Sequence, residues 1–234
     1  MRIGILEAGR LTSPLLERYG RYTQMFEVVL SGVEPSLEFS FYAALEGEFP
    51  KGVTACDGYV ISGGANGVYD RLDWMQGLQI FAKDAAASGR KVFGICLGHQ
   101  LLADAYGGKV VKSDKGWGAG VHRYNVHERQ PWMDPERDMF SSPVMHQDQV
   151  VEIPSGSHVL AGNEFCPNAM VQFNENVASL QCHPEFEVPA VRALIEKRRE
   201  IIGEEESDKA LLSLHDRNDA PLVAKWIVQF LKEA

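Results

Sequence analysis

The chain has 234 residues, of which 45% are hydrophobic and 24% charged, and it carries a formal net charge of −9 at pH 7. A chain of this size buries a core without disulfides or metal ions, and the acidic balance excludes a basic surface for nucleic acid. The N-terminal apolar run is too short for a signal peptide and no stretch of 18 apolar residues follows, which predicts a cytoplasmic protein that does not bind a membrane.

The first half of the chain alternates between strand-like and helix-like segments. Apolar residues that recur every three or four positions predict helices over 14–30 and 72–88. Short apolar runs predict strands over 2–6, 37–45, 58–64 and 91–95. This alternation favours a parallel sheet, whose ligands bind at the carboxyl ends of the strands.

The second half contains several short β-like runs between residues 117 and 182, followed by helices over 188–202 and 220–232. Asp219 is the expected N-cap of the last helix and Pro221 lies in its first turn. The acidic stretch 203–207 is interpreted as a solvated turn. Because there are no repeats or low-complexity linkers, we predict one domain over 1–234, with a core over 1–187 and a helical C-terminal extension over 188–234.

Cys96 lies in the segment "KVFGICLGHQ", between a predicted strand and a predicted helix. A strand–turn–helix arrangement places its sulfur at a helix N-terminus, where backbone N–H groups stabilise a thiolate. The alternative is a buried structural cysteine, and that interpretation is kept for Cys56, Cys166 and Cys182. The spacing of the four cysteines predicts neither a zinc site nor a disulfide framework.

The segment "SLQCHPEFE" contains a candidate base. His183 and Glu185 are two residues apart, so in an extended segment both side chains project to the same side. A carboxylate beside an imidazole fixes its tautomer and stabilises the imidazolium that forms when it takes a thiol proton. An exposed His–Glu pair without a function is the alternative.

The glycine-containing segment "ISGGANGVYD" (61–70) ends another predicted strand. Attack of a thiolate on an acyl carbon creates an oxyanion, which two fixed backbone N–H groups stabilise. The N–H of Leu97, which follows the nucleophile, is one candidate, and this glycine turn supplies the second. A plain turn is the alternative. A nucleotide-phosphate loop is not favoured, since no G-x-x-x-x-G-K-[ST] pattern is present.

Together, "GICLGHQLLADAYGGKV", "ISGGANGVYD" and "CHPEF" resemble the class I (triad) glutamine amidotransferases over residues 1–187. The similarity is closest to the glutaminase half of GMP synthetases, and "YGRYTQMFEVVL" is similar to the N-terminal segment of stand-alone plant γ-glutamyl peptidases. The resemblance implies a flavodoxin-like α/β fold. This fold has an open, mostly parallel central sheet flanked by helices, here with extra short antiparallel strands and a helical C-terminal extension.

The resemblance also implies roles for individual residues. Cys96 is the nucleophile, His183 the general base and acid, and Glu185 the residue that orients the histidine. The backbone N–H groups of Gly64 and Leu97 form the oxyanion hole, and no metal or cofactor is required. Further residues are expected to bind the substrate: Gly63, Gln100, His146 and Asp148. His99 is expected to pack rather than to react.

The implied reaction is hydrolysis of the glutamine side-chain amide through a γ-glutamyl thioester, releasing ammonia and glutamate. Since the chain has no ATP pyrophosphatase loop, the acceptor of the ammonia is expected on a separate synthetase subunit. A stand-alone γ-glutamyl hydrolase or peptidase is the second interpretation, and a non-catalytic sensor or binding module the third. The C-terminal helices either pack on the core, as we expect, or contact a partner or a second copy in a homo-oligomer.

The match departs from the family pattern in the turn and in one loop. Ala65 stands where the family usually has proline, which suggests that the peptide before Gly64 rotates more freely. Met145 and Gln147 replace the serine and glycine of the "SHGD" substrate loop of the synthetases.

Overall fold

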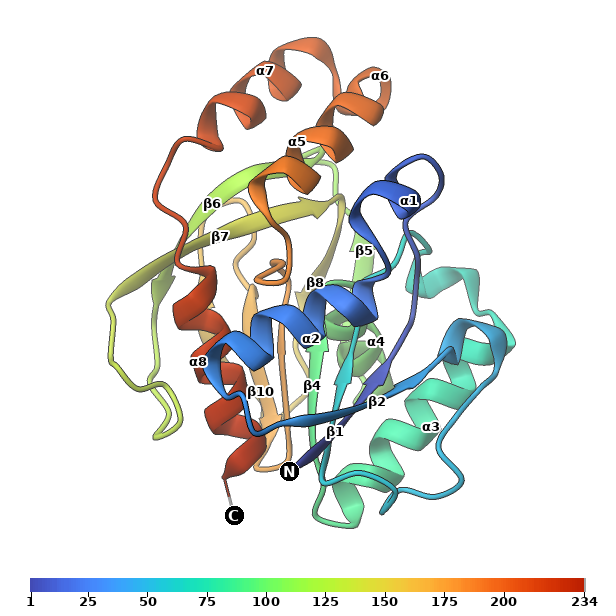
Figure 1. Cartoon of the computed structure of the whole chain (residues 1–234). Coiled ribbons are helices and arrows are strands. Elements are labelled where there is room, and N and C mark those ends of the chain that lie inside the picture. The colour runs from blue at the N-terminus through green and yellow to red at the C-terminus, as the bar shows by residue number, and fades with distance from the viewer. Residues whose placement is uncertain (234) are drawn as a thin grey trace.

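A nine-stranded sheet runs through the protein and draws strands from both halves of the chain (Figure 1). The structure is a computed structural model that describes residues 1–233. The strand order is β2-β1-β3-β4-β11-β10-β9-β6-β7, and the first five strands are mutually parallel. These five are β1 (Arg2–Leu6), β2 (Glu38–Tyr42), β3 (Gly58–Ile61), β4 (Lys91–Ile95) and β11 (Val177–Leu180).

The remaining four strands of this sheet pair in antiparallel fashion. They are β6 (Gly118–Val126), β7 (Met139–His146), β9 (His158–Gly162) and β10 (Met170–Asn174). A separate two-stranded sheet pairs β5 (Lys109–Lys112) with β8 (Asp148–Glu152). The predicted fold class, a mostly parallel central sheet with extra antiparallel strands, is confirmed.

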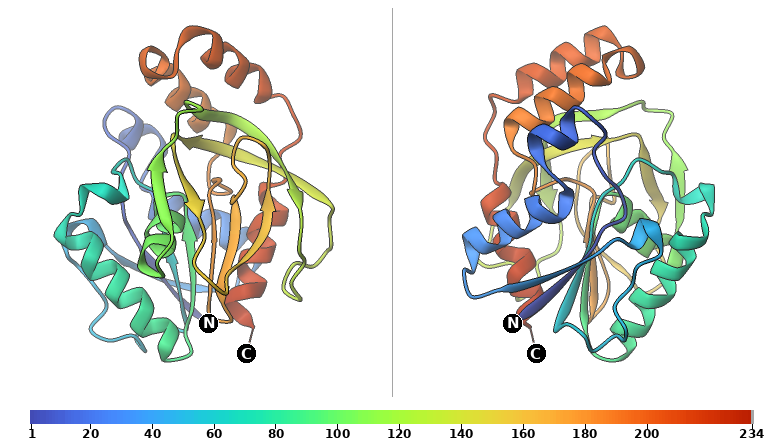
Figure 2. Two further views of the ribbon diagram at one scale, coloured as in Figure 1. Left: turned by 180° about the vertical axis from the view of Figure 1, so that it is seen from behind. Right: turned by 45° about the vertical axis from the view of Figure 1, so that its right-hand side comes forward.

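Helices cover both faces of the parallel strands (Figure 2). One face is covered by α2 (Tyr22–Val33) and α8 (Ala220–Lys232), the other by α3 (Asp73–Ala87) and α4 (Leu97–Ala105). The alternation of side chains along β4 explains this, since Phe93 packs in one buried cluster and Val92 in the other. Phe93 makes an edge contact with Phe230 of α8 at a centroid distance of 5.6 Å. The last predicted helix therefore packs on the core, as expected.

A third group of helices lies over the end of the sheet toward which the parallel strands point, at the top of Figure 1. It comprises α1 (Leu15–Tyr19), α5 (Val188–Lys197), α6 (Arg199–Ile202) and α7 (Glu204–Ser213). Their apolar side chains, among them Leu15, Val191 and Leu194, form a buried cluster with Val121 of β6 and Met145 of β7. The first three helices of the C-terminal extension, α5 to α7, thus lie next to the carboxyl ends of the parallel strands, where ligands are expected.

The structure corrects several sequence-based boundaries. The helix predicted over 14–30 is divided by Gly20, whose φ of 78° ends α1 before α2 begins. The strand predicted over 37–45 is shorter and is followed by a 3-10 turn, η1 (Ala44–Glu46); a second, η2 (Val68–Asp70), follows the glycine turn. The turn predicted at 203–207 is wrong, because α7 begins there. Three glutamates occupy its first turn, where the helix dipole favours acidic side chains.

Asp219 occupies the N-cap position of α8, with a proline in the first turn as predicted, but its side chain does not cap the helix. One carboxylate oxygen instead accepts a hydrogen bond from the backbone N–H of Ser141 at 3.0 Å, and the other accepts one from Arg217 Nε at 2.6 Å.

Among residues 1–233, no helix is both long enough and apolar enough to cross a bilayer.

Candidate active site

Cys96 occupies a sharp turn between β4 and α4. Its φ and ψ of 52° and −103° are uncommon for any residue other than glycine. The backbone is held there because Cys96 N–H donates to Leu180 O at 2.8 Å and Cys96 O accepts from Gln100 N–H at 3.0 Å. The side chain is only 5% exposed. Strained conformations that the surrounding structure enforces are concentrated at functional sites.

Glycines on either side of Cys96 let the helix approach the sheet closely. A Cβ atom on Gly94 would lie 2.6 Å from the carbonyl carbon of Gly98, and one on Gly98 would lie 2.6 Å from Ile61 O. Any side chain at either position would push α4 away from β3 and β4. The spacing G-I-C-L-G is therefore what allows the sulfur to stand directly above the strand ends.

His183 and Glu185 follow β11, the strand next to β4. His183 Nδ1 lies 2.6 Å from Glu185 Oε1, and both side chains are at most 4% exposed. The segment is not extended as the sequence predicted: it turns back, with Phe186 N–H bonded to His183 O at 3.3 Å. The Phe186 ring stacks on the imidazole at a centroid distance of 4.1 Å. The contact between the two side chains thus comes from a turn rather than from strand alternation.

The imidazole of His183 also meets Cys96. A Cβ on Gly63 would lie 2.8 Å from His183 Cε1 and 3.4 Å from Cys96 Cβ, so the missing side chain of Gly63 leaves room for this approach. Burial lowers the pKa of His183, but its interactions with the Glu185 carboxylate and with Cys96 outweigh burial and raise the pKa above its ordinary value. These interactions favour the imidazolium form of His183 over the neutral ring.

The glycine turn after β3 is held by Ser62. Its hydroxyl donates to Gly63 O at 3.0 Å and accepts Ala8 N–H at 2.9 Å. In a trans peptide the C=O and N–H point in opposite directions, so the Gly64 N–H faces away from the Ser62 hydroxyl. A Cβ on Gly64 would lie 2.6 Å from Leu97 Cδ2, so the absence of a side chain at Gly64 lets the turn pack against Leu97. The side chain of Ser62 thus restrains the peptide that lacks a following proline.

The loop after β1 packs against this turn and contains a buried carboxylate that the sequence analysis missed. Glu7 is fully buried and accepts hydrogen bonds from Arg10 Nε at 2.7 Å and Arg21 Nε at 2.9 Å. A Cβ on Gly9 in the same loop would lie 2.4 Å from Gly64 Cα. The Glu7 ion pairs therefore fix a loop that supports the glycine turn.

A cavity of about 160 Å³ opens beside Cys96, lined by the glycine turn, by Gln100 and by Asp148. Gln100 Nε2 donates to Asp148 O at 3.0 Å and to Gln181 Oε1 at 3.1 Å, which leaves the amide oxygen of Gln100 as a free acceptor. The Asp148 carboxylate accepts the Tyr69 hydroxyl at 3.2 Å. This wall presents acceptors, which suits an ammonium group.

Most of the predicted substrate-binding residues lie on this cavity. Gln100, His146 and Asp148 line it together with Cys96, whereas Gly63 lies under the His183 ring and not on the wall. His99 is buried and bonded through Nδ1 to Ser179 Oγ at 2.7 Å. The sequence analysis missed four further lining residues: Tyr69, Lys112, Trp117 and Arg198. Lys112, Trp117 and Arg198 lie outside the motifs, and Tyr69 lies in the glycine-containing segment 61–70 but was given no role there.

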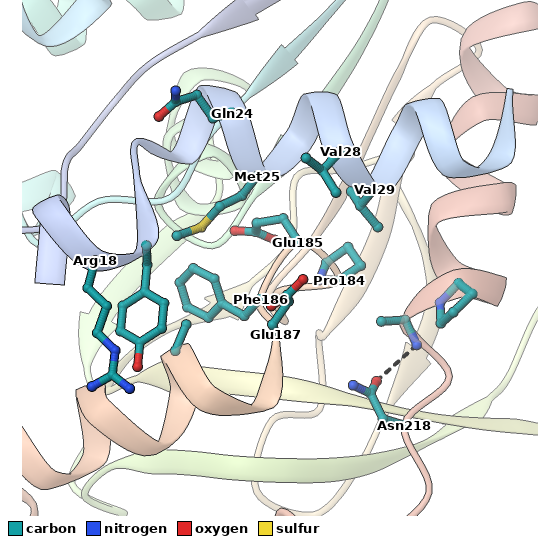
Figure 3. A pocket seen from close by; sticks show the side chains of 14 residues that line it. Arg18, Gln24, Met25, Val28, Val29, Pro184, Glu185, Phe186, Glu187 and Asn218 are labelled. Carbon is teal, nitrogen blue, oxygen red and sulfur yellow. Dashed lines mark hydrogen bonds between the residues drawn. The ribbon is translucent and has the colours of Figure 1, made fainter. Parts of the chain in front are cut away.

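A larger hollow, of about 440 Å³, lies behind the Glu185–Glu187 segment, between α2, α5 and the start of α8 (Figure 3). Met25 and Val28 of α2 line one side, and Asn218, which accepts the N–H of Ala220 at 2.9 Å, lies on the other. Cys96 and Gln100 do not line it. The smaller cavity is therefore the one that adjoins the thiol.

Among residues 1–233, no group of three or more His, Cys, Asp or Glu side chains is arranged to hold a metal ion.

Two buried histidines make stability depend on pH. Burial lowers the pKa of both His99 and His146 to about 3. A histidine in the unfolded chain titrates near pH 6.5, so between pH 6.5 and 3 the unfolded chain binds more protons than the folded chain. The free energy of unfolding therefore falls as the pH is lowered through this range. We expect the free energy of unfolding to fall by about 2 kcal/mol between pH 6.5 and 5.5, at about 1 kcal/mol per histidine, because half of the unfolded histidines are already protonated at pH 6.5.

Urea unfolding at the two pH values measures this loss, and the His99→Gln variant is the matched comparison. The variant should lose about half as much stability over the interval, whatever its stability at pH 6.5. An equal loss in both proteins would show that His99 does not contribute.

The chain is similar to known proteins in both sequence and fold. The sequence model of the family described as "Glutamine amidotransferase class-I" matches residues 33–198. Gamma-glutamyl peptidase 3 of Arabidopsis thaliana is 27% identical over 225 residues, which are 92% of this chain and 90% of the peptidase. GMP synthase [glutamine-hydrolyzing] of Clostridium novyi is 33% identical over 129 residues, but these are only 24% of the synthase. The crystal structure of a glutamine amidotransferase from Thermotoga maritima superposes over the whole chain with a TM-score of 0.79 at 15% identity, which shows a shared fold.

Proposed function

The chain belongs to the class I glutamine amidotransferase family, and from that premise we propose that it hydrolyses a γ-glutamyl amide bond through a thioester on Cys96. The observation that carries the proposal is the buried 2.6 Å contact between His183 and Glu185, beside a strained cysteine that opens onto a cavity. These are the parts of a nucleophile, a proton carrier and an orienting carboxylate.

In the proposed reaction, the proton of the Cys96 thiol passes to His183, whose imidazolium form is stabilised by Glu185. The Cys96 thiolate attacks the γ-carbonyl carbon, and the N–H groups of Leu97 and Gly64 bind the oxyanion. His183 then gives its proton to the leaving nitrogen, the C–N bond breaks and a γ-glutamyl thioester remains. His183 next takes a proton from water, whose oxygen attacks the thioester, and glutamate leaves as the C–S bond breaks.

The cavity wall supports a γ-glutamyl acyl group. The free amide oxygen of Gln100 and the carboxylate of Asp148 are acceptors for the α-ammonium group of such a substrate. Lys112, paired in register with Asp148, is a cation for its α-carboxylate. The two ends of the amino acid would thus be bound from neighbouring strands, with the γ-carbonyl carbon directed at Cys96.

Two kinds of substrate use this chemistry. The γ-glutamyl peptidase relative corresponds over nine tenths of both chains, which favours a stand-alone hydrolase of a γ-glutamyl peptide or conjugate. The match to GMP synthase supports glutamine, with ammonia passed to a separate synthetase subunit, but over about a quarter of that protein. We therefore place the peptide or conjugate first and glutamine second, which reverses the order that the sequence motifs alone favoured.

The test is glutamate release by the purified protein at neutral pH, with glutamine, glutathione and γ-glutamyl dipeptides supplied separately. We expect turnover of at least one γ-glutamyl peptide above that of glutamine. Quenched reactions analysed by mass spectrometry should show a γ-glutamyl adduct on the peptide that contains Cys96. Turnover of glutamine alone would favour the synthetase-dependent role, and no turnover and no adduct with any compound would refute the proposal.

A further inference from the structure

Arg198 brings a cation from the C-terminal extension to the cavity beside Cys96. It follows α5 and is half-buried, and its guanidinium lies over the Trp117 ring at 5.4 Å from the centroid. The neighbouring Arg199 is bound to the carboxylates of Glu204 and Asp208. Arg198 forms no ion pair with any carboxylate of residues 1–233. Stacking on an aromatic ring fixes a guanidinium without neutralising it.

The position of Arg198 relative to His183 indicates which part of a substrate the guanidinium would contact. Arg198 lines the 160 Å³ cavity, and it also lines a small space of about 10 Å³ next to the His183 and Phe186 rings. Gly64 and Met145 are the other residues that belong to both. Arg198 therefore stands where the cavity beside Cys96 meets the side on which His183 lies.

That side is where the leaving group departs in the proposed reaction, because His183 protonates the leaving nitrogen. The acyl half already has partners elsewhere, in Gln100, Asp148 and Lys112. Ammonia, the leaving group from glutamine, carries nothing for a guanidinium to bind. An amino acid or peptide that leaves through its α-nitrogen carries a carboxylate, which a guanidinium binds with two parallel hydrogen bonds.

We propose that Arg198, held by Trp117, binds the carboxylate of the amino acid or peptide joined to the γ-glutamyl group, and so selects γ-glutamyl peptides over glutamine and neutral amides. The inference rests on the proposed function and adds the class of leaving group.

The experiment compares γ-glutamylalanine with γ-glutamylalanine amide, which differ only in the carboxylate. The native protein should favour the acid by at least about tenfold in kcat/KM. Arg198→Gln should lower kcat/KM for the acid by about 10- to 100-fold, mainly through KM, and leave the amide within about twofold. Arg198→Lys should restore part of the preference, since it keeps the charge but not the planar fork. Arg199→Gln, one position along, is the matched control and should change neither substrate.

The outcomes separate this inference from the function on which it rests. If the native protein hydrolyses acid and amide equally, or if Arg198→Gln lowers both by the same factor, the assignment of Arg198 to the leaving group is wrong while γ-glutamyl hydrolysis stands. If the native protein hydrolyses neither compound but turns over glutamine, the assignment of Arg198 is wrong while the proposed chemistry stands; if it turns over no γ-glutamyl compound and forms no adduct, the proposed function fails and the inference falls with it. Thermal unfolding of the Arg198 variants establishes that they are folded.

Discussion

Replacement of Cys96 by serine is expected to reduce γ-glutamyl hydrolysis by at least about 1,000-fold. A serine hydroxyl is a much weaker acid than a thiol and gives up its proton to His183 far less readily, so the nucleophile in the attack is lost. The structure should be retained, because serine is of similar size and the strained turn is fixed by backbone bonds to Leu180 and Gln100. Steady-state glutamate release by variant and native protein measures the effect.

Cys56→Ser is the matched control, since Cys56 is another buried cysteine but precedes β3, at the opposite end of the parallel strands from Cys96; it should leave kcat/KM within about twofold. Alkylation at neutral pH provides a second measurement. Burial raises the pKa of Cys166 to about 12 and raises that of Cys182 further, so both remain thiols. An equally active Cys96→Ser protein, or modification of Cys166 or Cys182 ahead of Cys96, would contradict the assignment of the nucleophile.

Replacement of Glu185 by glutamine is expected to lower kcat by about 100- to 10,000-fold. Glutamine has nearly the same shape, but it is neutral and its amide nitrogen cannot accept the proton on His183 Nδ1. The imidazolium that the reaction needs then loses the partner that lies 2.6 Å away. Because Glu185 is buried and close to the ring, water does not replace its charge.

The pH profile gives the sign of this effect. Glu185 raises the pKa of His183, so its removal lowers that pKa, and the imidazole loses its proton at a lower pH. The alkaline limb of the kcat/KM profile should therefore move to lower pH by about one unit or more. Glu187→Gln, at an exposed position two residues along, is the matched control and should leave both rate and profile unchanged. A shift of the alkaline limb to higher pH, or none, would mean that Glu185 does not act through the histidine.

The parts of the site that lie close together along the chain could be predicted from the sequence. Cys96 with its flanking glycines, and His183 with Glu185, are short segments in which spacing alone limits the geometry. The prediction of an extended segment around His183 was nevertheless wrong, because a turn closed by Phe186 gives the same contact. Local spacing identified the partners but not the backbone that joins them.

The residues that the sequence analysis missed are those that only the fold brings together. Arg198 and Trp117 are 81 positions apart in the chain, and neither lies in a recognisable motif. β7 contains a Ser-Ser-Pro segment, which in a sequence is typical of a turn rather than of a strand. Pro143 is tolerated there because β7 is the last strand of the sheet, so its missing N–H costs no inter-strand bond on the open side. Its carbonyl accepts the N–H of His183 at 2.8 Å, which positions the histidine.

The Ser62 hydroxyl that holds Gly63 O has a consequence for when the protein would work. An enzyme that makes ammonia for a second protein loses that ammonia to solvent unless the second protein is bound. Such an enzyme can avoid the loss if its oxyanion hole forms only when the partner binds. In this protein the glycine turn is held by the Ser62 side chain of the same chain, which is adjacent to Gly63. We therefore expect this protein to be ready at all times, so that its output follows the amount of substrate in its surroundings and not the arrival of another molecule.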